Sequence, residues 1–324
     1  MTVLVVGGAG YIGSHAAHAL KHRGYEVIIY DNLVAGHAEL AQGFELIVGD
    51  MSDGTKLSQV LRRVDAVMHF AAHAYVGESV VNPRKYFQNN VLDGLTLLHA
   101  VLDANVRRFV FSSSCAVYGV PAKVPITEDL PRFPVNPYGV TKLIFEQALE
   151  SYGPAYGLGY VSLRYFNAAG ADEEGRIGEI HKPETHLIPS AFEAIRGERA
   201  ALEIFGDQYP TPDGTCVRDY IHVNDLAEAH VQGLEYLKGG GGSMALNLGT
   251  GSGHSVHEVL SAIKSVTGHE VPSRMAPPRP GDPPQLVADP ERAEKLLNWK
   301  AKRSLEEIVA TAWKWAERTQ PTTK

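Results

Sequence analysis

An apolar segment that runs directly into a glycine-rich turn constrains this chain more than any other feature. Residues Thr2–Val6 are mostly β-branched or aliphatic, which is typical of a buried strand. Gly7, Gly10 and Gly13 follow at once, in a G-x-x-G-x-x-G pattern that overlaps G-x-G-x-x-G. A helical pattern then continues to Arg23. Strand, glycine turn and helix in this order predict the start of a β-α-β unit.

The same alternation of short apolar runs and helical patterns continues through the first half of the chain. Further buried strands are predicted at Glu26–Tyr30, Glu45–Val48, Ala66–Phe70, Arg108–Ser112 and Tyr160–Tyr165. Helices are predicted at Thr55–Arg62, Pro83–Asn105 and Pro137–Tyr152. Strands that alternate with helices indicate right-handed crossovers. We therefore predict an α/β fold with a Rossmann-type doubly wound parallel sheet.

The rhythm changes after Asn167, which predicts a smaller C-terminal α/β substrate domain. Helical patterns return at Leu187–Arg196, Val223–Tyr236 and Leu305–Thr319. The proline-rich stretch from Pro272 to Pro284 is incompatible with a helix or a central strand, and we expect a long loop that covers a site. We place the domains at residues 1–167 and 168–324, with segments of the second returning to the first.

Composition excludes several classes of protein. The formal net charge of −7 provides no overall basic surface for nucleic acid. No apolar run reaches the roughly 20 residues of a membrane span. The two cysteines, Cys115 and Cys216, are too few for a disulfide framework. We expect a cytoplasmic protein with no nucleic-acid or membrane partner.

Two acidic residues follow predicted strands at positions that suit a dinucleotide. Asp31 comes directly after the second strand and 18 residues beyond Gly13, close to the spacing of the acid that binds a ribose hydroxyl. A carboxylate at this position favours NAD over NADP, because it would repel a 2′-phosphate. Asp50, after the third strand, is interpreted either as an adenine contact or as a turn residue.

A phenol and an ammonium group lie one helical turn apart at Tyr138 and Lys142. A nearby cation lowers the pKa of a phenol, and an oxidised nicotinamide would add positive charge, so the pair suits general acid–base chemistry on a hydroxyl. Ser112–Ser114 lies at the end of the fifth strand, where open α/β sheets bind ligands. Hydrolysis by a serine triad is disfavoured because no G-x-S-x-G elbow surrounds these serines.

Several motifs together resemble the extended short-chain dehydrogenase/reductase superfamily. They are the glycine turn, Asp31-Asn32-Leu33, Ser112-Ser113-Ser114, Val117-Tyr118-Gly119, Pro137-Tyr138-Gly139 with Lys142, and Leu163-Arg164-Tyr165-Phe166-Asn167. The segments Tyr209-Pro210-Thr211, Val217-Arg218-Asp219-Tyr220-Ile221-His222-Val223 and Arg279-Pro280-Gly281-Asp282 resemble more narrowly the UDP-glucose 4-epimerase family. The resemblance extends over essentially the whole chain.

This resemblance implies an isomerase of galactose and carbohydrate metabolism. It would interconvert UDP-galactose and UDP-glucose by transient oxidation at C4 to a 4-keto sugar, with hydride return from NAD. The catalytic residues implied are Ser114, Tyr138 and Lys142. The NAD contacts implied are Gly7, Gly10, Tyr11, Ile12, Gly13, Asp31, Asn32, Asp50, Met51, Phe70, Ala71, Ala72, Asn90, Tyr138, Lys142 and Tyr165. The UDP-sugar contacts implied are Ser114, Tyr138, Asn167, His186, Leu187, Phe205, Arg218, Tyr220, Arg279 and Asp282.

Three positions depart from the pattern of this family. Ala74 stands where many epimerases have lysine, and His73 is a candidate for a partial replacement. His186 stands where asparagine is frequent. Leu286 aligns with the residue that limits the size of the sugar pocket, which leaves N-acetylated sugars open as substrates.

Alternative functions remain within this interpretation. A UDP-N-acetylhexosamine or UDP-pentose 4-epimerase is the nearest alternative. A 4,6-dehydratase is disfavoured because it would need an acidic pair beside Ser114, where Cys115-Ala116 stands instead. A non-catalytic NAD-sensing scaffold is disfavoured because it would be expected to lack Tyr138 or Lys142, and both are present. We expect no metal site, since His69 and His73 straddle a strand end. The resemblance also implies a homodimer formed by Pro83–Asn105 and Pro137–Tyr152.

Overall fold

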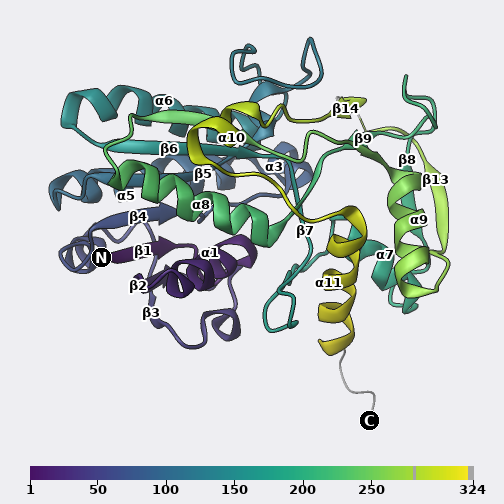
Figure 1. The fold of residues 1–324 in the computed structure, drawn as a ribbon, viewed down its shortest axis with the longest axis horizontal. Helices are drawn as coiled ribbons and strands as arrows, with labels where there is room; N and C mark the ends of the chain where they lie inside the picture. The colour runs from purple at the N-terminus through teal and green to yellow at the C-terminus, as the bar shows by residue number, and fades with distance from the viewer. Residues whose placement is uncertain (280–281, 320–324) are drawn as a thin grey trace.

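A parallel sheet of seven strands organises the computed structural model, which describes residues 1–279 and 282–319. The strands lie in the order β11-β6-β5-β4-β1-β2-β3 (Figure 1). Their bounds are β1 Thr2–Val6, β2 Glu26–Asp31, β3 Glu45–Val48, β4 Ala66–His69, β5 Arg108–Ser114, β6 Gly159–Tyr165 and β11 Met244–Leu248. The chain order reverses between β1 and β4, and open α/β sheets bind ligands at such a switch point. The predicted doubly wound parallel sheet is confirmed.

Helices cover both faces of this sheet, so its strands are apolar along their whole length. On one face, Leu20 and Leu234 pack against Val5 and Val161. On the other face, Leu57 and the ring of Phe145 belong to a second apolar cluster. The first face carries α1 (Tyr11–His22), α8 (Val223–Lys238) and α10 (Glu291–Leu297). The second carries α2 (Gly54–Leu61), α5 (Gly94–Asp103) and α6 (Pro137–Tyr156).

The prediction of one regular helix over Pro83–Asn105 is wrong. The segment divides into α4 (Pro83–Tyr86), a π-helical turn (η2, Phe87–Asp93) and α5, after the short α3 (Val76–Val81). In the π turn, the Asn90 side chain bonds the backbone of His73 and the hydroxyl of Thr141. These tertiary bonds favour a local bulge that helical periodicity does not reveal.

The second half of the chain contributes to both parts of the molecule. Strand β11 belongs to the large sheet, and helix α8 covers one of its faces. Helices α7 (Leu187–Ile195), α9 (Val256–Thr267) and α11 (Leu305–Arg318) lie together at the right of Figure 1, and their side chains share a separate apolar cluster. The remaining strands are short: β7 Asn167–Ala169, β8 Leu202–Phe205, β9 Val217–Arg218, β10 Tyr220–His222, β12 His254–Ser255, β13 Ser273–Ala276 and β14 Gln285–Leu286. The 3₁₀ turns are η1 Ala38–Ala41 and η3 Cys115–Tyr118. The boundary at residue 167 stays a prediction.

The proline-rich stretch is not entirely a loop. Its proline-free part, Ser273–Ala276, forms strand β13 and pairs only with β8 in a two-stranded sheet, where both strands are edges. Pro280 and Gly281 lie outside the described residues. Among the described helices, none has both the length and the apolar character needed to cross a membrane.

Candidate active site

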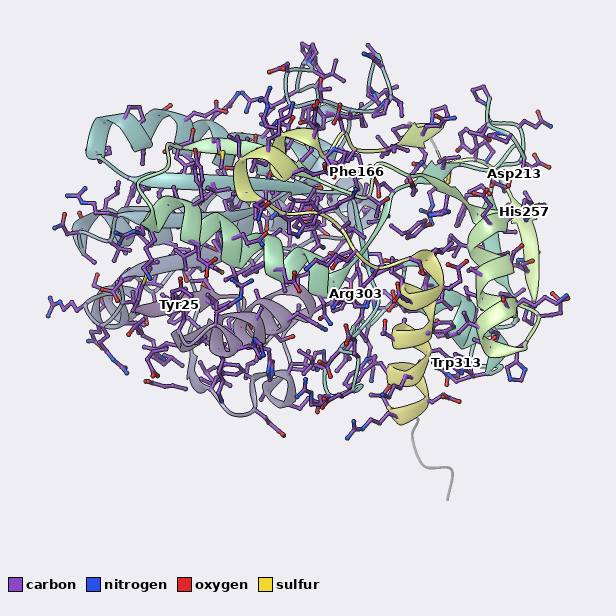
Figure 2. The ribbon with its side chains drawn as sticks, in the orientation of Figure 1. Tyr25, Phe166, Asp213, His257, Arg303 and Trp313 are labelled. Carbon is purple, nitrogen blue, oxygen red and sulfur yellow. The ribbon has the colours of Figure 1, made fainter. Side chains whose placement is uncertain are left out.

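A continuous cavity of about 1650 Å³ lies along the carboxyl ends of the strands, between the large sheet and the C-terminal elements. Phe166, which lies between these two parts in Figure 2, is one of its lining residues. Nearly all the predicted site residues line it as well. They are Gly7, Gly10, Tyr11, Ile12, Gly13, Asp31, Asn32, Met51, Phe70, Ala71, Ala72, Ser114, Tyr138, Lys142, Tyr165, Asn167, His186, Leu187, Phe205, Arg218, Tyr220, Arg279, Asp282 and Leu286.

The glycine turn at one end of the cavity requires its glycines for steric reasons. Gly7 has a φ of +79°, and a Cβ there would lie 2.4 Å from the backbone nitrogen of Ala71. A Cβ on Gly13 would lie 2.2 Å from the carbonyl oxygen of Gly7. A Cβ on Gly10, by contrast, would meet no protein atom closer than 3.4 Å. Gly10 is therefore open on the side of the cavity, at the N-terminus of α1, as a diphosphate requires.

Asp31, the last residue of β2, is held firmly beside this turn. The Asp31 carboxylate accepts hydrogen bonds from the backbone N–H of Ala9 at 3.0 Å and of Leu33 at 2.9 Å. Burial raises the pKa of Asp31, whereas these two hydrogen bonds lower it. The Asn32 side chain donates to Asp50 at 2.8 Å. The glycine turn, Asp31 and Asn32 fit a dinucleotide, with the diphosphate at the turn and a ribose at the acid.

Tyr138, Lys142 and Ser114 meet in the middle of the cavity. Helix α6 begins at Pro137, and the Asn136 side chain caps it by accepting from the N–H of Gly139 at 2.8 Å. This start places Tyr138 and Lys142 on successive turns facing the end of β5, whose last residue is Ser114. The Lys142 ammonium donates to the carbonyl of Ser112 at 2.6 Å.

Without a bound cofactor, burial is the largest influence on the pKa values of Tyr138 and Lys142. Burial raises the pKa of the Tyr138 phenol well above its usual value, and a hydrogen bond with Ser114 opposes this effect. Burial also lowers the pKa of Lys142 to about 7, with the Glu146 carboxylate opposing it. The Lys142 nitrogen lies 5.9 Å from the centre of the Tyr138 ring. In the polypeptide alone, burial outweighs any lowering of the Tyr138 pKa by this ammonium.

A buried ion pair joins helix α6 to the sheet behind Tyr138 and Lys142. Glu146 receives hydrogen bonds from Arg164 Nε at 2.9 Å and Nη2 at 2.7 Å, and from the Ser113 hydroxyl at 2.5 Å. The side chains of Glu146 and Arg164 are 1% and 3% exposed. The Arg164 guanidinium also donates to the Tyr118 hydroxyl at 2.8 Å. Since these bonds join α6 to β5 and β6, they fix the position of the helix that carries Tyr138.

Two arginines lie at the far end of the cavity. The Arg279 guanidinium stacks on the Phe205 ring, 3.9 Å from its centre. Arg218 is buried, donates to the Val217 carbonyl at 2.8 Å and forms an ion pair with Asp282. Planar guanidinium groups are well suited to a diphosphate. This end of the cavity therefore fits a nucleoside diphosphate.

The loop before α7 brings charged groups to the same cavity. His186 is the N-cap of α7, and its Nδ1 contacts the Glu179 carboxylate. Although burial opposes the charged imidazole, Glu179 raises the pKa of His186 to about 9. Glu184 and His181 lie beside this pair. Sequence analysis singled out only His186 from this loop, because the others follow no regular spacing.

Two predicted cofactor contacts do not line the cavity. The Asn90 amide is fully engaged with His73 and Thr141, and its neighbour Asn89 lines the cavity instead. Asp50 accepts hydrogen bonds from Asn32 and Ser52. His73 stays a prediction as a partial replacement for the missing cation, although burial lowers the pKa of His73 and so disfavours its charged form.

Comparison with known proteins agrees with this geometry. The sequence model of the NAD dependent epimerase/dehydratase family matches residues 3–249. The UDP-glucose 4-epimerase of Rhizobium meliloti is 52% identical over 318 residues, which cover 98% of this chain and 97% of the relative. The solved structure of the Brucella ovis UDP-glucose 4-epimerase in complex with NAD is 51% identical, with a TM-score of 0.94 and coverage of 96% and 97%.

A second solved structure is similar over its whole length. The Bifidobacterium longum UDP-glucose 4-epimerase in complex with NAD⁺ and UDP is 40% identical, with a TM-score of 0.94 and coverage of 98% of this chain and 99% of that one. Both the sequence and the fold of this chain match these relatives over nearly its whole length. The chain belongs to the NAD dependent epimerase/dehydratase family.

Proposed function

We propose that this chain is an isomerase that epimerises C4 of a UDP-hexose, converting UDP-galactose to UDP-glucose with NAD as its bound cofactor. One observation carries the proposal: a single cavity is lined by the glycine turn, by Tyr138 and Lys142, and by Arg218 and Arg279. Two nucleotide-sized ligands that enter from opposite ends would meet at Tyr138. The relatives named above are UDP-glucose 4-epimerases, and two of them are solved with NAD.

The residues that we assign to NAD surround the glycine turn and Asp31. Gly7, Gly10 and Gly13 would receive the diphosphate, and Asp31 would bind a ribose hydroxyl. Bound there, NAD would supply the acceptor for the C4 hydride and the donor that returns it. The other assigned contacts are Tyr11, Ile12, Asn32, Met51, Phe70, Ala71, Ala72 and Tyr165. Asp50 and Asn90 do not line the cavity; they hold the lining residues Asn32 and His73 through hydrogen bonds.

The proton chemistry belongs to Tyr138, assisted by Ser114 and Lys142. Tyr138 as phenolate takes the proton of the C4 hydroxyl while the Ser114 hydroxyl holds the same oxygen. The sugar becomes a ketone, and Tyr138 returns the proton when the alcohol is formed again with inverted configuration. The Lys142 ammonium stabilises the phenolate across the buried site, where its charge is weakly screened.

The sugar must turn over between the two halves of the reaction while its nucleotide stays bound. The groups that we assign to the UDP part are Asn167, His186, Leu187, Phe205, Arg218, Tyr220, Arg279 and Asp282. The guanidinium groups provide the strong contacts, whereas Leu286 beside the sugar position is apolar and makes no hydrogen bond through its side chain. A firmly held diphosphate and a loosely held hexose therefore permit the rotation.

The test of this function uses purified protein and UDP-galactose without added NAD. UDP-glucose should form, and Tyr138→Phe should lower kcat by roughly 10²–10⁴-fold, the usual contribution of general acid–base catalysis. The nucleotide content of the variant should remain that of the parent. Release of a 4-keto-6-deoxy sugar, or dependence on added NADPH, would contradict the proposal and favour a dehydratase or a reductase.

The assembly state is a separate proposal: the chain forms a homodimer through the segments Pro83–Asn105 and Pro137–Tyr152. Among the described residues, two large apolar side chains of the first segment are exposed: Phe87 at 37% and Leu92 at 55%. Burial of such side chains against a second copy would be favourable. Sedimentation of the parent and of Leu92→Glu tests this, with a shift to monomer expected for the variant.

The cellular setting is also a proposal. We place the protein in the cytoplasm, in galactose metabolism. Cys115 and Cys216 are both unpaired, which is consistent with a reducing compartment. Fractionation of the native host would check the assignment.

A further inference from the structure

Four side chains on one loop of the cavity lining form a cluster of nitrogen and oxygen donors, of which the proposed reaction uses only His186. Glu179, His181, Glu184 and His186, named here the His/Glu cluster, each offer one ligand atom, and these atoms all lie within 4.8 Å of one another. Among residues 1–279 and 282–319, no other group of three or more His, Cys, Asp or Glu side chains converges in this way. Two imidazoles with two carboxylates are a donor set that zinc-like cations prefer.

The candidate ligand atoms of the cluster are closely spaced. His181 Nδ1 lies 2.8 Å from Glu179 Oε1, His186 Nδ1 contacts the same oxygen, and His186 Nδ1 lies 3.9 Å from Glu184 Oε1. Ligand atoms at about 2.0–2.1 Å from a tetrahedral zinc ion are roughly 3.3–3.4 Å apart. The Glu179 carboxylate would therefore have to move away from both imidazoles for a cation to enter between them.

Hydrogen bonding inside the protein leaves part of the cluster unsatisfied. His181 Nδ1 is buried, and its one near polar neighbour is the Glu179 carboxylate at 2.8 Å, with which it forms no well-aligned hydrogen bond. The side chains of Glu179 and Glu184 are only 7% and 6% exposed. Two carboxylates that are withheld from water at this separation repel each other, and a divalent cation would compensate both.

The backbone of the loop is anchored independently of the cluster. The Trp315 indole of α11 donates to the Glu179 carbonyl at 2.9 Å, and its ring lies against Gly178, where a Cβ would approach within 2.5 Å. The Tyr75 ring contacts the His181 ring edge-on, with centroids 5.5 Å apart. These contacts hold the donors close together before any ion arrives, which lowers the entropy cost of binding.

We propose that the His/Glu cluster is a structural site for a divalent transition-metal cation of the zinc class. Four protein ligands would close the coordination shell, as in structural rather than catalytic sites. The imidazole donors disfavour Mg²⁺ and Ca²⁺, which prefer oxygen ligands. Since His186 begins α7 and Leu187 lines the cavity, the cation would fix the backbone at the entrance of the proposed sugar-nucleotide site.

The test measures metal binding directly and needs no activity assay. Untagged full-length protein is treated with a chelator, and Zn²⁺ is titrated in competition with a chromogenic chelator. One Zn²⁺ per chain is expected, and His181→Ala should weaken its affinity by at least about 100-fold, because loss of a direct ligand exceeds the 10–100-fold cost of losing an outer partner. Glu184→Gln should act in the same direction.

The controls separate a built site from histidines that bind zinc at the surface. His22→Ala removes an exposed histidine of α1 and should leave the affinity unchanged. X-ray absorption of the Zn²⁺ form should show two imidazole ligands, and Zn²⁺ should raise the melting temperature of the parent but not of His181→Ala. Far-UV circular dichroism without metal checks that His181→Ala is folded.

Two results would overturn the site. One is an affinity for Zn²⁺ that is equal in the parent and in folded His181→Ala. The other is an equal loss of affinity in His22→Ala. Either result would identify the His/Glu cluster as an ion-pair network around a protonated His186. Because binding is measured without substrate, failure here leaves the proposed epimerisation untouched, and failure of the epimerase assay leaves this site untouched.

Discussion

Replacement of Lys142 by methionine should make the protein more stable, because the native structure buries an ammonium group at a free-energy cost. The Lys142 side chain is buried, and burial lowers its pKa from 10.5 to about 7. Methionine fills similar space without a charge. Loss of the hydrogen bond to the Ser112 carbonyl would offset part of the gain.

The size of the effect and its sign follow from proton linkage. Below pH 7 both the folded and the unfolded chain carry the Lys142 proton, and the folded chain bears the full cost of burial. Between about pH 7 and 10.5 the unfolded chain binds more protons than the folded chain, so stability rises with pH by up to about 1.4 kcal/mol per unit. Between pH 6 and pH 9, loss of the Lys142 proton in the folded chain raises the free energy of unfolding of the parent protein by about 3 kcal/mol.

The measurement is urea denaturation of nucleotide-free parent and Lys142→Met protein at pH 6, 7, 8 and 9. The stability advantage of Lys142→Met should be largest at pH 6 and should shrink by about 3 kcal/mol by pH 9. Lys300→Met, at an exposed lysine, should follow the parent at every pH. An advantage that stays constant or grows with pH would refute the reasoning, because it would mean that Lys142 is not a buried charge in the folded chain.

Three further substitutions test the support, the cofactor end and the sugar end of the site. Glu146→Ala should lower the free energy of unfolding by about 3–5 kcal/mol, measured by urea denaturation, because Arg164 is left as an unpaired buried charge; a loss below 1 kcal/mol contradicts this. Gly13→Ala should lose both stability and bound nucleotide, whereas Gly10→Ala should lose only the nucleotide, as absorbance of the denatured protein and melting curves would show. Leu286→Tyr should lower kcat/KM for UDP-N-acetylgalactosamine about tenfold relative to UDP-galactose, since a larger ring narrows the pocket; equal effects on both substrates would argue against a size gate.

The large sheet could be predicted from sequence because its determinants are local. Short β-branched runs such as Thr2–Val6 form strands wherever both faces are covered, and the glycines that follow fix the turn. The π turn around Asn90 could not be predicted, since its cause is a set of bonds to Thr141 and to the backbone of His73, distant in sequence. Strand β11 was missed for a related reason: it joins the sheet beside β6, after a long excursion of the chain.

The parts of the candidate site that follow a local sequence pattern could be predicted, whereas the parts that depend on contacts distant in sequence could not. Tyr138 and Lys142 follow helical spacing, so their shared face is visible in the sequence. The ion pair between Arg218 and Asp282 joins segments 64 residues apart, and only a resemblance to known proteins suggested both residues. The His/Glu cluster follows no helical or strand period, because an irregular loop brings its donors together.

Helix α6 connects the chemistry of the site to the stability of the fold. Tyr138, Lys142 and Glu146 occupy positions i, i+4 and i+8 on one face, and all three are buried. Burial favours the neutral forms of Tyr138 and Lys142, whereas the Glu146 carboxylate opposes it at Lys142. Glu146 is itself held by Arg164 and Ser113, which belong to β6 and β5. The ion pair in the core therefore helps to keep the ammonium charged beside the phenol, and a substitution at Glu146 should shift the pH dependence of catalysis as well as the stability.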